Sequence, residues 1–160
     1  MSVMIIKIHG VKGGSGKTTI SKYLFYYFRK KERKRVSLYS IEEIVKCDNP
    51  EIIILDNVNL TIKNGNIEWK LFVTDPQSLE LSLNYVKKDD DFIIVNKVSP
   101  FPCEQNEIIK KVYKFRSVLV PFNGKLFYEE YDELAEPTLN RLAENLLGLR
   151  KDRLIVPFQQ

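Results

Sequence analysis

The chain has 160 residues, 44% of them hydrophobic, which is enough for a single domain over residues 1–160 with one sizeable core. The 25 Lys and Arg against 21 Asp and Glu give a net charge of +4, too small to indicate nucleic-acid binding by itself. No apolar run approaches the ~20 residues of a membrane-spanning helix, and the start lacks the pattern of a secretory signal. Cys47, Cys103 and a single histidine do not favour a disulfide scaffold or a transition-metal site, so we expect a cytoplasmic protein.

The first third of the chain alternates apolar strands with one amphipathic helix. Residues 3–8 are aliphatic, as in a buried parallel strand, and a glycine-rich loop follows them. Val36–Tyr39 and residues 52–55 are predicted strands, and the second ends at Asp56. Between the loop and residue 36, apolar side chains at helical spacing predict a helix with an inward face of Ile20, Tyr23, Leu24, Tyr27 and Phe28.

Turn residues punctuate the middle of the chain. Asn64-Gly65 lies between β-rich flanks at residues 60–69 and predicts a two-residue hairpin, followed by a strand at residues 71–74. Asp75-Pro76 has the pattern of a helix N-cap with proline at the first helical position. Leu79, Leu83 and Val86 are expected to line one side of that helix.

The last third continues the alternation. Residues 92–95 and 118–120 are predicted buried strands, and Pro102 is expected to open a helix between them. A final helix is predicted from the apolar spacing of Leu139, Leu142, Ala143, Leu146 and Leu147. Strands that alternate with helices predict an α/β fold of three layers, with a mainly parallel sheet and helices on both faces.

The strongest functional signal is the loop GVKGGSGKTT, which joins the first strand to the first helix. Glycines such as Gly13, Gly14 and Gly16 allow successive backbone N–H groups to turn toward phosphate oxygens. The helix N-terminus adds a partial positive charge. Lys17 is placed to reach the β- and γ-phosphates of a nucleotide, and the Thr18 hydroxyl is placed to ligate Mg²⁺.

The segment KGGSGKTT, with a second lysine at Lys12, resembles the deviant Walker A motif of the ParA/MinD family of P-loop ATPases. The resemblance implies a P-loop NTPase fold, ATP and Mg²⁺ as cofactors, and a homodimer that forms on ATP binding. It also implies that Lys12 reaches across the dimer to the partner's phosphates, as a catalytic residue beside Lys17. Val11 stands where the generic motif has glycine, a position that varies in the family.

Weaker matches extend the resemblance along most of the chain. PEIIILDNV resembles the family's Walker B strand, which implies that Asp56 supports the metal together with Thr18. FIIVNKV implies that Asn96 contacts adenine, although an asparagine at a strand end also bonds its own turn. VLVPF implies that Pro121 flanks the base. The implied nucleotide-binding set is Gly13, Gly14, Ser15, Gly16, Lys17, Thr18, Thr19, Asn96 and Pro121.

The family pattern fails where its members carry an acidic D-x-D switch. Ser40 stands in place of the first Asp and Glu42 in place of the catalytic second one, so we expect slow hydrolysis. The other interpretation is that Glu42 and Glu43 are acids that begin a helix. The function implied is an ATPase that positions or partitions DNA, such as a plasmid, or another cargo. The alternatives are a non-hydrolysing nucleotide-dependent adaptor and a small-molecule kinase or ligase of the same fold group.

Partner signals are few. Six of the seven residues that begin at Arg29 and end at Arg35 are basic, and they either contact DNA phosphates non-specifically or form a solvated helix end. A protein partner is possible but unidentified. The C-terminal helix is followed by more apolar residues, so it is expected to pack on the sheet rather than bind a membrane. His9, with no nucleophile partner, is expected to be structural.

Overall fold

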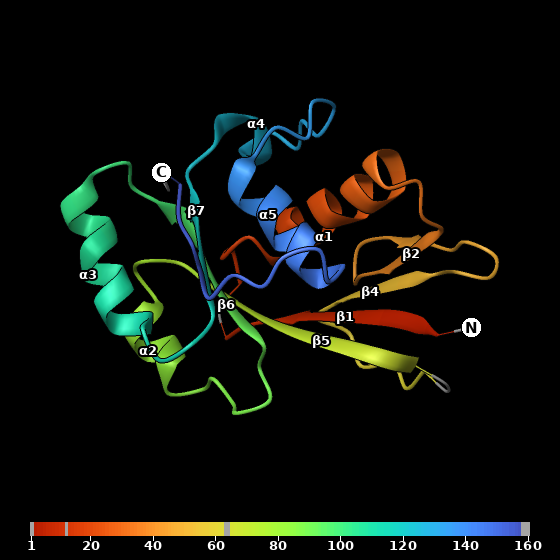
Figure 1. Ribbon diagram of the computed structural model, residues 1–160, viewed down its shortest axis with the longest axis horizontal. Coiled ribbons are helices and arrows are strands. Elements are labelled where there is room, and N and C mark those ends of the chain that lie inside the picture. The colour runs from red at the N-terminus through yellow and green to blue at the C-terminus, as the bar shows by residue number, and fades with distance from the viewer. Residues whose placement is uncertain (1, 12, 63–64, 158–160) are drawn as a thin grey trace.

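The computed structural model describes residues 2–11, 13–62 and 65–157, and it shows an α/β architecture (Figure 1). In this part of the chain one mostly parallel sheet has the strand order β3-β2-β4-β1-β5-β6-β7-β8. Only β2 and β3 pair antiparallel. The strands are β1 (Val3–His9), β2 (Val36–Tyr39), β3 (Ile44–Val45), β4 (Ile52–Asp56), β5 (Gly65–Thr74), β6 (Phe92–Val98), β7 (Ser117–Pro121) and β8 (Leu154–Ile155).

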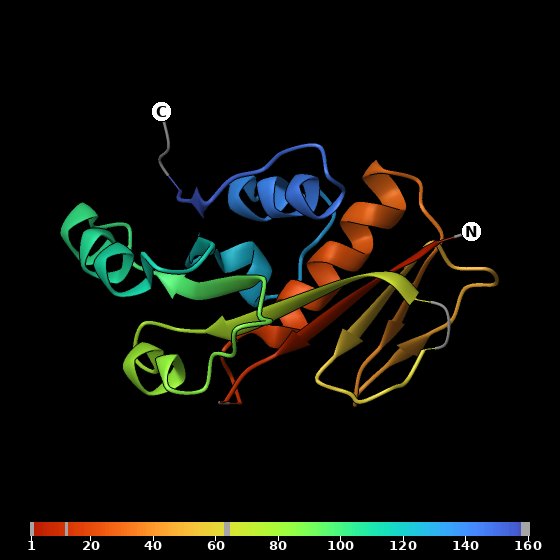
Figure 2. The same cartoon turned by 60° about the horizontal axis from the view of Figure 1, so that its bottom comes forward.

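The helices cover the two faces of the sheet unevenly. They are α1 (Lys17–Tyr26), which continues as the π-helical turn η1 (Tyr27–Lys31), α2 (Leu79–Leu83), α3 (Pro102–Val112), α4 (Gly124–Phe127) and α5 (Pro137–Leu146). On the first face α1 and α5 pack together over the aliphatic side chains of the central strands (Figure 2). On the second face α2 and α3 pack against β6 and β7, with Leu154 of β8 at the margin of the same cluster.

The second face over β1 and β4 has an irregular cover. Ile5, Ile53 and Leu55 are buried there, and Val58 and Ile62 pack against them from the segment after β4. The described residues of this segment, 57–62, contain neither strand nor helix. The predicted α/β class with helices on both faces is therefore confirmed, but the layer on the second face is incomplete.

The hairpin predicted from Asn64-Gly65 is wrong. β5 begins at Gly65 and runs unbroken to Thr74, and it pairs parallel with β1 over most of its length and with β6 toward its end. Residues 57–62 form no strand that could be the other arm, and Asn64 lies outside the described residues. β5 therefore pairs with strands distant in sequence rather than with a hairpin partner, as context often decides in sheets.

The helix expected after Asp75-Pro76 begins later than predicted. The Asp75 carboxylate accepts a hydrogen bond of 2.8 Å from the Ser78 backbone amide, which is a capping contact, but residues 76–78 form turns. The helix α2 begins at Leu79 and ends at Leu83, so Val86 lies beyond it. Val86 nevertheless packs against the same core cluster as Leu79.

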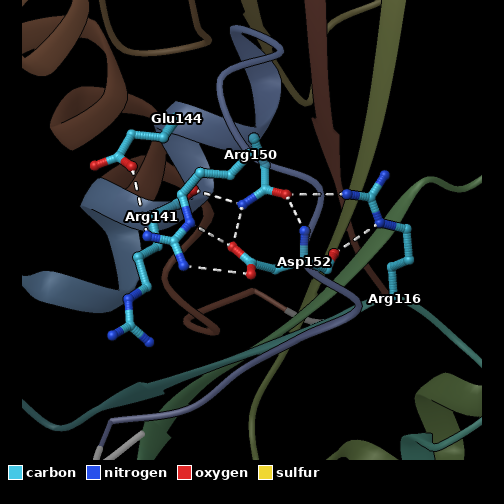
Figure 3. Close-up of polar contacts among 6 residues, drawn as sticks. Arg116, Arg141, Glu144, Arg150 and Asp152 are labelled. Atoms are coloured by element: carbon cyan, nitrogen blue, oxygen red, sulfur yellow. Dashed lines mark hydrogen bonds and ion pairs between the residues drawn. The ribbon is translucent and has the colours of Figure 1, made fainter. Parts of the chain in front are cut away.

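A polar network holds the C-terminal segment against the sheet (Figure 3). The buried Asn145 amide oxygen accepts from the Asp152 backbone amide at 2.7 Å and from the Arg116 guanidinium at 3.1 Å. The Asp152 carboxylate accepts from Asn145 Nδ2 at 3.0 Å and from Arg150 Nε at 2.8 Å. The network leads the chain back to β7, where Leu154 pairs with Ser117.

The helix α5 is a core element, as its apolar spacing predicted. Leu139, Leu142 and Ala143 are fully buried, and Leu146 is 1% exposed. Pro137 is its first residue, and Glu136 caps it through a hydrogen bond from the Thr138 amide. No described helix is long and apolar enough to cross a membrane.

We expect Leu142→Ala to lower the free energy of unfolding by about 2–5 kcal/mol, because it opens a cavity between α5 and the sheet. Leu149→Ala is the matched control, since Leu149 is 67% exposed and Leu142 is 0% exposed. Its effect should stay within about 0.5 kcal/mol in urea denaturation. Equal effects of the two substitutions would contradict the packing of α5 on the sheet.

Candidate nucleotide-binding site

The loop between β1 and α1 passes close to two neighbouring strands, which explains two of its glycines. A Cβ atom at Gly10 would lie 2.4 Å from the Val73 carbonyl oxygen of β5. A Cβ atom at Gly16 would lie 2.0 Å from the Asn96 amide nitrogen of β6. Gly16 also has a φ of 103°, a left-handed conformation that side chains other than glycine rarely adopt. Larger residues at these positions would push the loop off the sheet.

The first turn of α1 is suited to an anion. The helix begins at Lys17, Gly16 is its N-cap, and the first turn has no acidic residue and no side-chain cap. Backbone N–H groups at a helix start lack intrahelical partners, and the helix dipole places partial positive charge there. The loop therefore presents N–H groups together with the Lys17 ammonium at one place.

A cavity of about 400 Å³ opens in front of this helix start. Four parts of the chain form its wall. They are the phosphate loop, the residue after β4, the end of β6 and the segment from β7 to α4. The lining residues are Gly13, Gly14, Gly16, Lys17, Thr18, Thr19, Asn57, Asn96, Lys97, Pro121, Phe122, Asn123, Leu126 and Phe127. Of the predicted nucleotide-binding residues only Ser15, which is buried, is not part of this wall.

A direct hydrogen bond joins the two predicted metal ligands. Thr18 Oγ1 donates to Asp56 Oδ2 at 2.9 Å, and Asp56 is only 4% exposed. Burial raises the pKa of the Asp56 carboxyl above its usual 3.8, and the bond from Thr18 acts in the opposite direction. The nearby charges of Lys17 and Glu42 also act on this pKa, lowering and raising it respectively. The buried carboxylate thus costs stability in the absence of a cation.

The residues fit Mg²⁺ as part of a nucleotide complex rather than alone. A hydroxyl and a carboxylate are oxygen ligands that Mg²⁺ accepts, with water and phosphate oxygens completing its shell. Among the described residues no group of three or more His, Cys, Asp or Glu is placed to hold a metal. Thr18 and Asp56 would therefore bind the metal only together with phosphates.

Two residues near the end of β6 brace the phosphate loop. Asn96 Nδ2 donates to the Ser15 carbonyl at 3.1 Å, and Lys97 Nζ donates to the Gly14 carbonyl at 2.5 Å. Asn96 is buried and faces the loop, whereas Lys97 has a φ of 60° at the end of the regular pairing. The side chain predicted to contact adenine thus bonds the loop in this structure. The sequence analysis missed Lys97, for which the only signal is its place after a buried strand.

Phe122 and Phe127, in the segment after β7, form an aromatic rim beside Pro121. The sequence predicted Pro121 in this place but not the two rings. Phe122 and Phe127 are each 60% exposed, and their ring centroids are 6.0 Å apart. Asn123 caps α4 by accepting from the Lys125 amide at 2.9 Å. Two exposed rings beside a cavity are a surface on which a flat heterocycle can stack.

Asn123 is fixed in turn by a buried acid. Its amide nitrogen donates to Glu136 at 3.0 Å, and Glu136 is 4% exposed. Glu136 also caps α5 by accepting from Thr138. The aromatic rim is therefore tied to the core helix α5.

The stretch around Glu42 is a tight turn between β2 and β3, so the interpretation of Glu42 and Glu43 as helix-start acids is wrong. The Ser40 hydroxyl donates to the Glu43 carbonyl at 2.9 Å and accepts from the Glu43 amide at 3.0 Å. These local bonds compete with helix formation. Glu42 is exposed and does not line the cavity, but it lies near enough to influence the pKa of Asp56.

Two further predicted residues have different outcomes. Lys12 lies outside the described residues, so its proposed reach to a partner subunit stays a prediction. His9 forms an ion pair of 2.5 Å with Asp90 and an edge contact with the Phe72 ring. These contacts agree with a structural role for His9. Comparison of the chain with known protein families and with curated proteins found no match to either.

We expect Asp56→Asn to stabilise the nucleotide-free protein at pH 7, because it removes a buried charge. The native pKa of Asp56 is raised above the unfolded value of 3.8, so its contribution to stability is greatest below pH 3.8 and is lost as the pH rises through the native pKa. The variant should therefore lose less stability than the wild type above about pH 4. Urea denaturation across pH measures this, with the exposed Asp132→Asn as control. A less stable Asp56→Asn protein would contradict the prediction.

Proposed function

We propose that the protein binds Mg-ATP at this cavity as a small P-loop ATPase of the ParA/MinD type. The observation that carries the proposal is the hydrogen bond from Thr18 to Asp56 beside a glycine loop that opens α1. A hydroxyl at the helix start paired with a carboxylate at the end of a neighbouring strand is the pair expected at a P-loop metal site. An ordinary glycine-rich turn without a ligand would give no reason for a hydroxyl and a buried carboxylate to be placed together.

The phosphates would lie along the loop. Backbone N–H groups of Gly13, Gly14 and Gly16 donate to phosphate oxygens, and the Lys17 ammonium neutralises charge on the β- and γ-phosphates. Mg²⁺, when bound, would neutralise further charge on the same oxygens. The bonds that Asn96 and Lys97 make to loop carbonyls hold the loop in this shape before the ligand arrives, which reduces the ordering cost of binding.

The base would lie at the other end of the cavity. Phe122 and Phe127 offer faces for a purine, and Pro121 lies beside them in the wall. Asn96 would offer its amide oxygen to the base, since within the described part of the chain its bond to the loop is made through the amide nitrogen. Adenine is the base that the resemblance implies.

Hydrolysis would be slow. Ser40 supplies no carboxylate, and its hydroxyl is engaged by the backbone of the turn. The charge of Glu42 raises the pKa of Asp56, yet Glu42 does not line the cavity. The same observations favour a second function, a nucleotide-dependent adaptor that binds ATP without turning it over.

ATP binding would then control assembly. In the proposed cycle a homodimer forms on the triphosphate, Lys12 completes the partner's site, and hydrolysis releases the dimer from DNA or another cargo. The basic run from Arg29 to Arg35 is less free for DNA than its sequence suggests. Arg35 and Lys34 pair with Glu51 at 3.4 and 3.8 Å, and the Arg29 guanidinium lies 5.6 Å from the centre of the Phe25 ring.

Lys17→Ala should weaken Mg-ATP binding on the order of 100-fold, because the loop loses its phosphate-facing cation. Calorimetry on the full chain measures the affinity, and circular dichroism verifies that the variant is folded. Lys110→Ala on the exposed face of α3 is the control and should bind as the wild type does. Unchanged affinity in a folded Lys17→Ala protein would refute the nucleotide site.

Glu42→Gln separates the ATPase from the adaptor. If Glu42 orients the attacking water, the substitution should lower the turnover rate by about 10²–10⁴-fold while ATP still binds. Glu43→Gln is the matched control, because Glu43 is the neighbouring acid and lies 4.0 Å from Lys22 rather than beside Asp56. Phosphate release by the purified protein is the measurement. Equal measurable rates in the wild type and both variants would refute the role of Glu42, whereas phosphate release at background level in all three would favour the adaptor.

A further inference from the structure

A second pocket lies on the opposite face of the sheet from α1, next to the nucleotide cavity. It has a volume of about 280 Å³, close to the lower end of small-ligand sites. Asn57, the residue after Asp56, lines both cavities. Its charged and titratable lining consists of three lysines, two carboxylates and one histidine: Lys7, Lys70, Lys87, Asp89, Asp90 and His9.

The position of Lys7 is unusual for a cation. It lies in the middle of the central strand β1. The residues on either side of it, Ile6 and Ile8, are buried on the other face under α1. Its side chain is 39% exposed because no described helix covers this part of the second face. In the register of β1 with β5, Lys7 stands directly opposite Lys70. Two like charges side by side on a sheet oppose folding unless something compensates them.

Two exposed carboxylates compensate these two lysines, and one of them, Asp89, also lines the pocket. Lys7 pairs with Glu68 at 2.8 Å, and Lys70 pairs with Asp89. The Glu68 and Asp89 side chains are 43% and 57% exposed. Exposed ion pairs contribute little to stability. A bound anion can therefore share these ammonium groups at small cost.

The third lysine is held over the pocket by a fixed turn. The Lys87 backbone amide donates to Asp90 Oδ2 at 2.8 Å, and the other oxygen, Asp90 Oδ1, lies 2.5 Å from His9 Nε2. The Asp90 side chain is 1% exposed, so both of its oxygens are already engaged. Among the described residues the Lys87 ammonium has no ion-pair partner. Asp90 thus anchors the turn, and the charge of Lys87 acts on the pocket's other carboxylate, Asp89, without forming an ion pair with it.

We propose that this pocket binds a small polyanion, a phosphate- or dicarboxylate-bearing molecule, between Lys7, Lys70 and Lys87. A carboxylate or phosphate group accepts hydrogen bonds from ammonium groups strongly. The Asn57 amide adds a neutral donor on the side of the nucleotide cavity. The site requires no bound nucleotide, so it stands independently of the proposed ATPase. Its place beside Asn57 makes the ligand a neighbour of the first cavity.

Amide NMR of the full chain, titrated with inorganic phosphate and with succinate at constant ionic strength, tests the proposal. We expect saturable shifts at Lys7, Lys70 and Lys87 with at least one anion, and the stronger binder identifies the ligand class. Lys87→Ala should weaken this binding by roughly tenfold or more. Lys88→Ala is the matched control, because this neighbouring exposed lysine does not line the pocket, and it should bind as the wild type does.

Two further variants separate the possible outcomes. Anion binding should persist in Lys17→Ala, which disables the phosphate loop, and should weaken in Lys7→Met. Shifts confined to the phosphate loop and lost in Lys17→Ala would overturn the proposal, as would an equal loss in Lys87→Ala and Lys88→Ala. The absence of saturable shifts with both anions would overturn it as well. If Lys17→Ala binds no nucleotide yet retains the anion, the two sites are independent.

Discussion

The closeness of the phosphate loop to β5 and β6 is the constraint on which the site depends. Gly10 leaves no room for a side chain against the Val73 carbonyl, and Gly16 leaves none against the Asn96 amide. Because the loop lies so near the sheet, Asn96 and Lys97 can reach its carbonyl oxygens. The loop is therefore shaped by the neighbouring strands as much as by its own glycines. A glycine loop without this support would be more mobile and would pay more entropy on binding.

Stability and chemistry oppose each other at Asp56. The carboxylate is buried at the end of β4, where desolvation raises its pKa, and the hydrogen bonds from Thr18 and Ser21 act in the opposite direction. An apolar residue at this position would suit the core better. Under the proposed function the arrangement would become favourable once a cation and phosphates approach, since the charge would then be neutralised in place. Unfavourable burial of a carboxylate in a cleft is a feature common at functional sites, and it supports that proposal.

Much of the fold follows from the sequence, because its main elements carry local signals. The aliphatic strands β1, β4, β6 and β7 and the amphipathic helix α5 are set by burial patterns that need no knowledge of distant partners. The course of β5 could not be predicted this way, because its partner β1 is distant in sequence and leaves no local signal. The turn at Ser40 was not predicted, because a serine followed by two acids has the same sequence pattern as the start of a helix. In the structure the Ser40 side chain bonds the backbone of a turn instead.

Of the candidate site, the sequence clearly predicted the residues that lie within the glycine-rich motif. The motif contains Lys17 and Thr18, but it says nothing of Asn57, Lys97 or the aromatic rim, which join the cavity through the order of the strands. The chain leaves β1 toward β2 on one side and returns to β5 on the other, so the loops after β1 and β4 border a crevice at the carboxyl edge. Ligands of open α/β sheets bind at such a switch point.

The same topology exposes the second pocket. The crossover from β4 to β5 contains no helix in its described residues, so the second face of β1 lacks the layer that an ordinary βαβ unit would supply. Lys7 occupies this uncovered face, where a buried strand would normally carry an aliphatic side chain. A neutral polar residue on this exposed face would avoid repulsion between like charges. Lys7 instead lies opposite Lys70, so the uncovered face of the sheet is positively charged next to the first cavity. This positive charge is the physical reason for the proposed anion site.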